Sequence, residues 1–267
     1  MDQTKDLGTP ARNSLQSRLF AVAQALRFAQ ALGLACAATL GTSILFRLVP
    51  VIDIETSRLF YADGHGFPAT SIPILKFLRT LGLWSMDGAM AGVAVLTLLR
   101  CTLPERFQPA RFYLIPPSLL IFLTASAAIG PGLVTNVILK DHWGRARPIL
   151  SNVFGGPQTF SLPWTMSDAC HSNCSFVSGE GSGVFWLIAF VFVVPAIWRV
   201  PLFRFLRIWI VTISLNRIAF GGHYLSDVLI GWGLMLIVIL ICREIIIVWL
   251  GPKIDAWFER WQHRQIA

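Results

Sequence analysis

The sequence KDHWGRARP at residues 140–148 places four charged side chains and a histidine directly after a long apolar segment. Two further polar runs have the same setting. CSFVSGE at residues 174–180 precedes an apolar segment, and NRIAFGGHYLSD at residues 216–227 joins two of them. The three runs therefore bring cations, two histidines and three carboxylates to places where hydrophobic segments begin or end. Such a set of groups suits a pocket for a phosphate at the edge of a membrane.

The composition indicates a membrane protein. The 267 residues are 55% hydrophobic and 13% charged, whereas soluble domains carry about 25% charged residues. The formal net charge of +8 does not indicate nucleic acid binding, because the cations are spread over short loops between apolar runs. We expect an all-α fold, with a flexible cytoplasmic tail at residues 1–17 and a single membrane-embedded domain at residues 18–267.

Segments of about 20 mostly apolar residues can cross a bilayer as helices. Residues 48–71 are too polar to cross and are expected to lie at the membrane interface. Pro116, Pro117 and Pro131 are expected to kink the third span. The six predicted spans are residues 28–46, 81–99, 112–139, 181–197, 206–220 and 224–250.

Six spans put both termini on one side of the membrane. The segments on that side would hold 14 of the 22 lysines and arginines, which predicts that both termini are cytoplasmic in a bacterial inner membrane. The three polar runs then face the periplasm. Cys170 and Cys174 lie in this outward loop, where an oxidising compartment favours a disulfide. The alternative, half of a metal site, lacks further thiols nearby.

Lys140 and Arg147 are seven residues apart, which on a helix is close to two turns and puts both side chains on one face before Pro148. Arg145 would point elsewhere, and we expect it to pair with Asp141, four residues earlier. An ordinary basic cluster is the alternative, but it would belong on the cytoplasmic side of the membrane.

Ser178 and Gly179 are placed to start the fourth span. A helix N-terminus offers unpaired N–H groups to an anion; Ser178 suits the capping position and Gly179 allows an oxyanion to approach the backbone. Glu180 carries a carboxylate into the apolar phase, where a charged group costs free energy, so a functional role is expected. The alternative for Glu180 is a second interaction with the helix end.

Arg217 ends the fifth span, and Gly221 and Gly222 permit a sharp turn into the sixth. His223 and Asp227 are four residues apart and share a helix face. A carboxylate that binds one ring nitrogen of a histidine fixes the tautomer and makes the other nitrogen nucleophilic. A satisfied polar histidine at a helix start is the alternative.

These residues, taken together, resemble the three-part signature of the type 2 phosphatidic acid phosphatase superfamily. That family usually has Pro-Ser-Gly-His in its second part, where this chain has VSGE at residues 177–180, and Ser-Arg in its third, where this chain has NR at residues 216–217. The matching positions are Lys140-x₆-Arg147-Pro148, Ser178-Gly179 and Arg217-x₅-His223-x₃-Asp227.

The resemblance implies a phosphatase that needs no metal and no cofactor. His223 would attack phosphorus to give a phosphohistidine, Asp227 would orient its ring, and Glu180 would take the general-acid role that the family gives to histidine. The phosphate oxygens would be held by Lys140, Arg147, Ser178, Gly179 and Arg217.

A site at the membrane surface indicates a phosphorylated lipid as substrate. The candidates are lipid A, phosphatidylglycerophosphate and undecaprenyl pyrophosphate, and a phosphotransferase with a lipid acceptor is a further alternative. The variant second motif, with the C-x₃-C before it, is similar to the corresponding segment of lipid A phosphatases. A glutamate acid suits a weakly basic leaving oxygen, which favours the anomeric phosphate of lipid A or undecaprenyl pyrophosphate.

Two other classes of protein share some of these features. Vanadium haloperoxidases share the motif residues but are soluble. A lipid transporter would place ionisable groups near the bilayer midplane. Asp87 alone lies well inside a predicted span, and we expect it in the outer third of the membrane, paired with an arginine.

Overall fold

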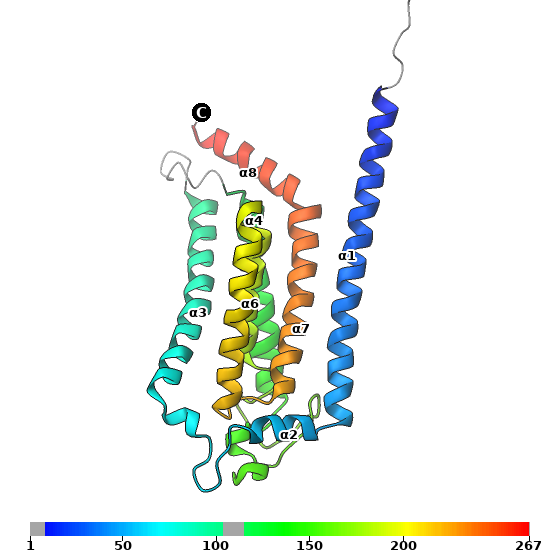
Figure 1. The fold of residues 1–267 in the computed structure, drawn as a ribbon. Coiled ribbons are helices and arrows are strands. Elements are labelled where there is room, and N and C mark those ends of the chain that lie inside the picture. The colour runs from blue at the N-terminus through cyan, green and yellow to red at the C-terminus, as the bar shows by residue number, and fades with distance from the viewer. Residues whose placement is uncertain (1–8, 104–114, 267) are drawn as a thin grey trace, which may run out of the picture.

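The structure, a computed structural model, describes residues 9–103 and 115–266, and within these ranges it contains helices and no strands. Figure 1 shows α1, α3, α4, α6 and α7 lying along one direction. Helix α2 crosses the lower end of this bundle, and α8 slants across the upper end. The bounds of these helices are α1 Thr9–Leu48, α2 Val51–Arg58, α3 Pro73–Thr102, α4 Pro117–Ala127, α6 Ala196–Ala219, α7 Leu225–Cys242 and α8 Gly251–Ile266.

Four helices of the described chain are long and apolar enough to cross a membrane: Ala21–Leu48, Pro73–Thr102, Pro117–Lys140 and Leu225–Trp249. The predicted span at residues 181–197 is shorter in the structure, where α5 (Gly179–Trp186) continues as a 3₁₀ segment, η7 (Leu187–Phe192). The predicted span at residues 206–220 overlaps α6 up to Ala219, and α6 also carries three arginines in its first half. The all-α membrane class is therefore confirmed, with four helices meeting the requirements for a span.

Two local predictions differ from the structure. Helix α1 begins at Thr9, so residues 9–17 of the predicted tail are helical, while residues 1–8 lie outside the described ranges. Pro116 and Pro117 begin α4 and do not kink it, because a first-turn N–H has no helical partner to lose.

The third proline changes the type of helix. After α4 the chain continues as a π-helix, η4 (Ala128–Lys140), which contains Pro131. A proline removes a helical hydrogen bond and crowds the carbonyl four residues before it, so a wider helix is a physical response to it. Residues 112–114 of this predicted span lie outside the described ranges.

Helix α5 lies at the centre of the bundle and packs against α3, η4, α6 and α7. Its small residues allow this position, since a Cβ on Gly183 would collide with the sulfur of Met86. Trp186 is fully buried, and its indole N–H donates to the Ser126 hydroxyl at 3.0 Å. Close packing around α5 therefore fixes its N-terminus relative to the neighbouring helices.

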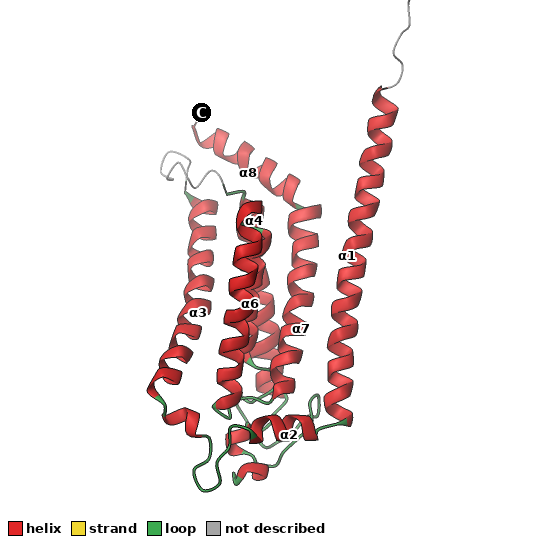
Figure 2. Cartoon of the chain, viewed as in Figure 1, coloured by secondary structure: helices red, strands yellow, loops and turns green. Residues whose placement is uncertain are grey.

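Loops and short helices gather at the lower end of the bundle, as the green segments of Figure 2 show. They include the predicted interfacial segment, with α2 and the 3₁₀ turn η1 (Pro68–Ser71), and the loop from residue 141 to residue 178 with the turns η5 (Pro148–Leu150) and η6 (Asn152–Phe154). The start of α1 and the C-terminal end of α8 lie at the opposite, upper end. The three polar runs thus meet at the end of the bundle away from the termini.

Candidate active site

Lys140 and Arg147 converge on the same residue, Asn173. The Lys140 Nζ donates to Asn173 Oδ1 at 3.1 Å, and the Arg147 Nη2 donates to Asn173 Oδ1 at 2.9 Å and to its carbonyl at 2.7 Å. The predicted reason for their convergence was wrong, because the helix ends shortly after Lys140 and Gly144 turns the chain with a φ of +62°. Two cations that share one amide oxygen can equally share an oxyanion.

His223 lies in the sharp turn between α6 and α7. The backbone of Gly222 lies against the guanidinium of Arg217, so closely that a Cβ there would collide with Nη2. Gly221 has a φ of +61°, and a Cβ there would lie 2.6 Å from the ring of Phe67. The glycine pair therefore permits both the turn and the approach of Arg217 to the backbone beside His223.

The His223 ring is buried, at 1% exposure, and its Nδ1 lies 2.8 Å from the carbonyl of Ser175. A carbonyl can only accept, so Nδ1 carries the hydrogen and Nε2 keeps its lone pair. Burial and the positive charges of Arg217, Arg147 and Lys140 hold the pKa of His223 well below its ordinary value. The ring is therefore neutral at pH 7, as a nucleophile requires.

Asp227 does not bind the His223 ring, which corrects the predicted direct contact. Its Oδ2 accepts from the Ser175 hydroxyl at 2.6 Å and from the backbone N–H of Tyr224 at 2.9 Å. Ser175 in turn presents its carbonyl to the histidine. Asp227 thus acts on the ring through Ser175, a residue that spacing along the sequence could not identify.

Arg145 is fully buried and pairs with two carboxylates. Its Nη1 lies 2.5 Å from Asp227 Oδ1, and its Nη2 lies 2.9 Å from Asp53 Oδ2. The predicted pair with Asp141 was wrong, because the chain leaves the helix between them. Burial alone would lower the pKa of Arg145, but Asp227 and Asp53 outweigh it and raise the pKa above its ordinary value. The guanidinium therefore stays charged.

Asp53 was not singled out from the sequence, although it lies in the segment predicted to be interfacial. It is buried on α2 and also accepts from the backbone N–H of Ser226 at 2.8 Å and from the Ser226 hydroxyl at 2.5 Å. This set of contacts connects α2 to the start of α7 and to the loop before η5. Its only sequence signal is an acidic residue among apolar ones.

Ser178 and Gly179 begin α5, as predicted. The Ser178 hydroxyl accepts from the N–H of Gly181 at 3.1 Å, so it caps the helix and keeps its own hydrogen to donate. A Cβ on Gly179 would lie 2.6 Å from Lys140 Nζ. The helix start and the lysine ammonium are thus neighbours, and a side chain at residue 179 would separate them.

The sequence matches a known family over the part of the chain that carries these residues. Residues 118–249 match the PAP2 superfamily. Three lipid A 4′-phosphatases are similar to this chain: one from Rhizobium leguminosarum is 36% identical over 200 residues, which is 70% of this chain and 84% of the relative. One from Rhizobium etli is 35% identical over 200 residues, 70% and 76% of the two chains, and one from Francisella tularensis subsp. novicida is 32% identical over 188 residues, 69% and 82%. The chain belongs to the PAP2 superfamily. No solved structure matches it.

The position where this PAP2 protein departs from the family pattern, Glu180, lies between two arginines. Arg79 of α3 binds the carboxylate with its Nε at 3.2 Å from each oxygen and its Nη2 at 2.9 Å from Oε1. The Nε of Arg217 lies 3.2 Å from the same Oε1. Arg79 was not identified from the sequence. The glutamate thus joins α3, α5 and α6 beside the predicted phosphate site.

The loop that carries Asn173 is closed by a disulfide between Cys170 and Cys174, with 2.19 Å between the sulfur atoms. His171 of the same loop lines a cavity of about 390 Å³ together with Arg147 and Gln158. The loop therefore forms one wall of the space in front of Arg147. A disulfide that fixes the loop also fixes the amide on which Lys140 and Arg147 converge.

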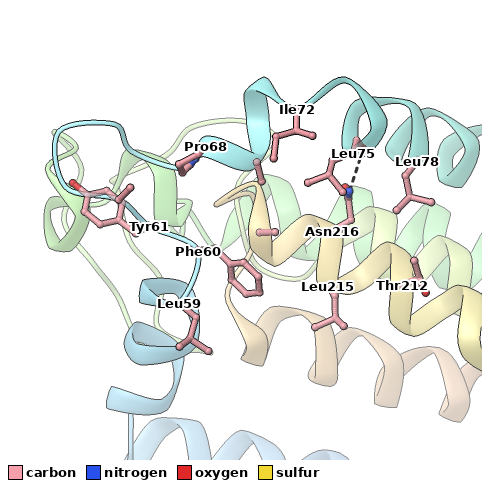
Figure 3. A pocket seen from close by; sticks show the side chains of 13 residues that line it. Leu59, Phe60, Tyr61, Pro68, Ile72, Leu75, Leu78, Thr212, Leu215 and Asn216 are labelled. Atoms are coloured by element: carbon pink, nitrogen blue, oxygen red, sulfur yellow. Dashed lines mark hydrogen bonds between the residues drawn. The ribbon is translucent and has the colours of Figure 1, made fainter.

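An apolar hollow of about 610 Å³ lies on the side of α6 next to the site (Figure 3). Its walls come from α6, from the start of α3 and from the segment after α2, with Phe60 and Leu75 among the lining side chains. The Asn216 Nδ2 donates to the Leu75 carbonyl at 3.1 Å. Asn216 replaces the usual serine of the third PAP2 motif, and this contact ties α6 to α3 just before Arg217.

Proposed function

We propose that this protein is a lipid phosphatase of the bacterial inner membrane that removes the 4′-phosphate of lipid A through a phosphohistidine at His223. The observation that carries the proposal is a buried histidine whose Nδ1 faces the Ser175 carbonyl and whose pKa is lowered by burial and by three nearby cations. The names of the three relatives supply the substrate. They favour the 4′ ester over the anomeric phosphate and the pyrophosphate favoured by the sequence alone.

In the first step the Nε2 lone pair of His223 forms a bond to phosphorus, and the bond from phosphorus to the sugar oxygen breaks. The ring becomes positively charged, and its Nδ1–H still donates to the Ser175 carbonyl. Lys140, Arg147 and Arg217, with the Ser178 hydroxyl and the Gly179 N–H, stabilise the charge that develops on the phosphoryl oxygens. Water then attacks phosphorus and gives a proton to the Glu180 carboxylate, the N–P bond breaks, and phosphate leaves.

The proposed orientation places the site in the periplasm, with both termini in the cytoplasm and six passages of the chain through the bundle. Two observations support it: the termini lie at the end of the bundle opposite the site, and the segments assigned to the terminal side hold 14 of the 22 lysines and arginines. A phosphate at this edge would reach the site by lateral movement of its lipid.

The purified protein in detergent is expected to release phosphate from lipid A bearing a 4′-phosphate, and EDTA is expected to leave the rate unchanged. Vanadate, which resembles five-coordinate phosphorus, is expected to inhibit. The panel should include lipid A with only the anomeric phosphate, phosphatidylglycerophosphate and undecaprenyl pyrophosphate. Preference for one of these lipids would identify it as the substrate in place of the 4′-phosphate of lipid A. Loss of activity on chelation would overturn the metal-free mechanism. Transfer of the phosphate to a second lipid would indicate a phosphotransferase.

Glu180 is proposed as the proton donor to the leaving sugar oxygen. Its side chain is paired with Arg79 and Arg217, which holds it beside the predicted phosphate site. The 4′ oxygen of a sugar is an ordinary alkoxide when it leaves, so it needs this proton.

Glu180→Gln is expected to lower turnover of the lipid by about 10²–10⁴-fold, the usual range for general acid catalysis. The loss should be smaller on p-nitrophenyl phosphate, whose leaving oxygen needs little help. The comparison of kcat on the two substrates decides the role. Equal losses would mean that Glu180 only positions Arg79 and Arg217, and the acid would then be sought at His171.

A further inference from the structure

A second groove of about 450 Å³ leads from the candidate active site into the membrane region between α3 and the α4–η4 helix. At the end near the site it is lined by Lys140, Gly179 and Glu180. Further along α3 and α4 its walls are apolar, with Met90 and Ala94 among them. Residues predicted to bind phosphate and residues of two spans thus line one continuous space.

Asp87 places a carboxylate in this groove. It is exposed and makes no hydrogen bond or ion pair with any described residue. Among the described residues no arginine pairs with Asp87, and Arg79, two turns earlier on α3, is bound to Glu180. An unpaired carboxylate within a span is costly, and such residues generally serve a substrate.

The position of Asp87 determines where on a bound ligand the hydrogen-bond donor for this carboxylate must lie. Asp87 is eight residues after Arg79, which is about 12 Å along a helix, and its side chain tilts back toward the site. Asn136 also lines the groove, and its Oδ1 would be 3.2 Å from a Cβ on Gly179. Acceptor oxygens therefore continue from the phosphate site into the groove.

We propose that this groove holds an acyl chain of the lipid substrate and that Asp87 accepts a hydrogen bond from a hydroxyl or amide N–H near the headgroup end of that chain. The inference rests on the proposed function and narrows it to lipids whose chains carry such a donor. A plain fatty acyl ester offers only carbonyl acceptors and leaves the carboxylate unpaired in an apolar groove. Asp87 is thus a specificity-determining residue.

The test compares three lipid monophosphates in the same detergent: one with 3-hydroxyacyl chains, one with an amide-linked chain without a hydroxyl, and phosphatidic acid with neither. Wild-type protein is expected to prefer one of the first two over phosphatidic acid, and which one identifies the donor. Asp87→Leu is expected to reduce this preference in kcat/KM by about 10- to 100-fold, the range for a hydrogen bond to a charged group.

Asp87→Asn keeps an acceptor oxygen and is expected to retain part of the preference. Asp87→Asn also serves as the test variant if Asp87→Leu does not fold. Folding is judged by hydrolysis of p-nitrophenyl phosphate, which has no acyl chain. A preference unchanged in the variants, or absent in the wild type, would overturn the proposal while leaving the phosphatase intact. Absence of phosphate release from every lipid would overturn both.

Two substitutions, each of which narrows one of the two apolar spaces, test which space holds the acyl chain. Ala128→Phe narrows the α3–α4 groove at an exposed position, and Leu215→Phe narrows the hollow of Figure 3 in the same way. Ala128→Phe is expected to raise the KM for long-chain lipids about tenfold or more, and Leu215→Phe to leave it near the wild-type value. The reverse result would place the chain in the hollow and overturn the assignment.

Discussion

Phosphate release is expected to fall by more than about 10³-fold when His223 is replaced by alanine. The reason is that no other described side chain combines a free nitrogen lone pair with the charges of Arg217, Arg147 and Lys140. The measurement is inorganic phosphate released from the lipid at saturating substrate. A second measurement follows the covalent intermediate, since labelled phosphate should be trapped on wild-type protein and not on the variant.

The matched control for His223→Ala is His142→Ala. His142 is exposed at the end of the π-helix, and its ring contacts only backbone carbonyls of the preceding turn. Its replacement is expected to change turnover by less than about threefold. Activity of His223→Ala within tenfold of wild type, in protein that is monodisperse in detergent, would rule out His223 as the nucleophile.

Replacing Arg145 by leucine is expected to reduce the free energy of unfolding by about 3–5 kcal/mol, because it leaves Asp53 and Asp227 buried without their cation. The free energy of unfolding of Arg145→Lys is expected to lie between those of the wild type and Arg145→Leu. One ammonium cannot reproduce the guanidinium fork that reaches both carboxylates. The measurement is the unfolding transition of purified protein in detergent, with activity recorded below that transition.

Arg147→Leu is the matched control, two residues away in the same loop. Arg147 is partly exposed and contacts Asn173 without any carboxylate partner, so its loss is expected to change stability by less than about 1 kcal/mol and to lower kcat/KM by about 10²–10³-fold. Equal losses of stability in the two variants would show that the Arg145 contacts are not the structural centre of the site. Full activity in Arg147→Leu would remove it from the phosphate site.

The membrane class could be predicted because hydropathy accumulates over about 20 residues and does not depend on tertiary contacts. The absence of a long helix between residues 51 and 71 could be predicted for the same reason. The short length of α5, which replaces the predicted fourth span, could not be predicted, because the burial of α5 depends on Gly183 packing against Met86 of α3. The prolines at 116 and 117 were misjudged because their effect depends on whether they stand at a helix start or inside one.

The motif residues of the candidate site could be listed from the sequence, but two of their contacts could not. Spacing suggested an Arg145–Asp141 pair and a direct His223–Asp227 bond, since both lie four residues apart. In the structure the chain leaves the helix before Arg145, and Asp227 reaches the histidine only through Ser175. Helical periodicity has no predictive value where the helix has ended.

The sequence by itself determined the chemistry available to this protein: its apolar segments, its PAP2 motif residues and the order in which they occur. Those properties are local, since each is carried by a residue type or a short spacing. Only the tertiary structure decided which groups act together. Asp53 and Arg79 come from segments far from the motif, and they reach Arg145 and Glu180 because α2 and α3 fold against the motif helices. A contact between such distant segments depends on packing between helices, which no spacing along the chain encodes.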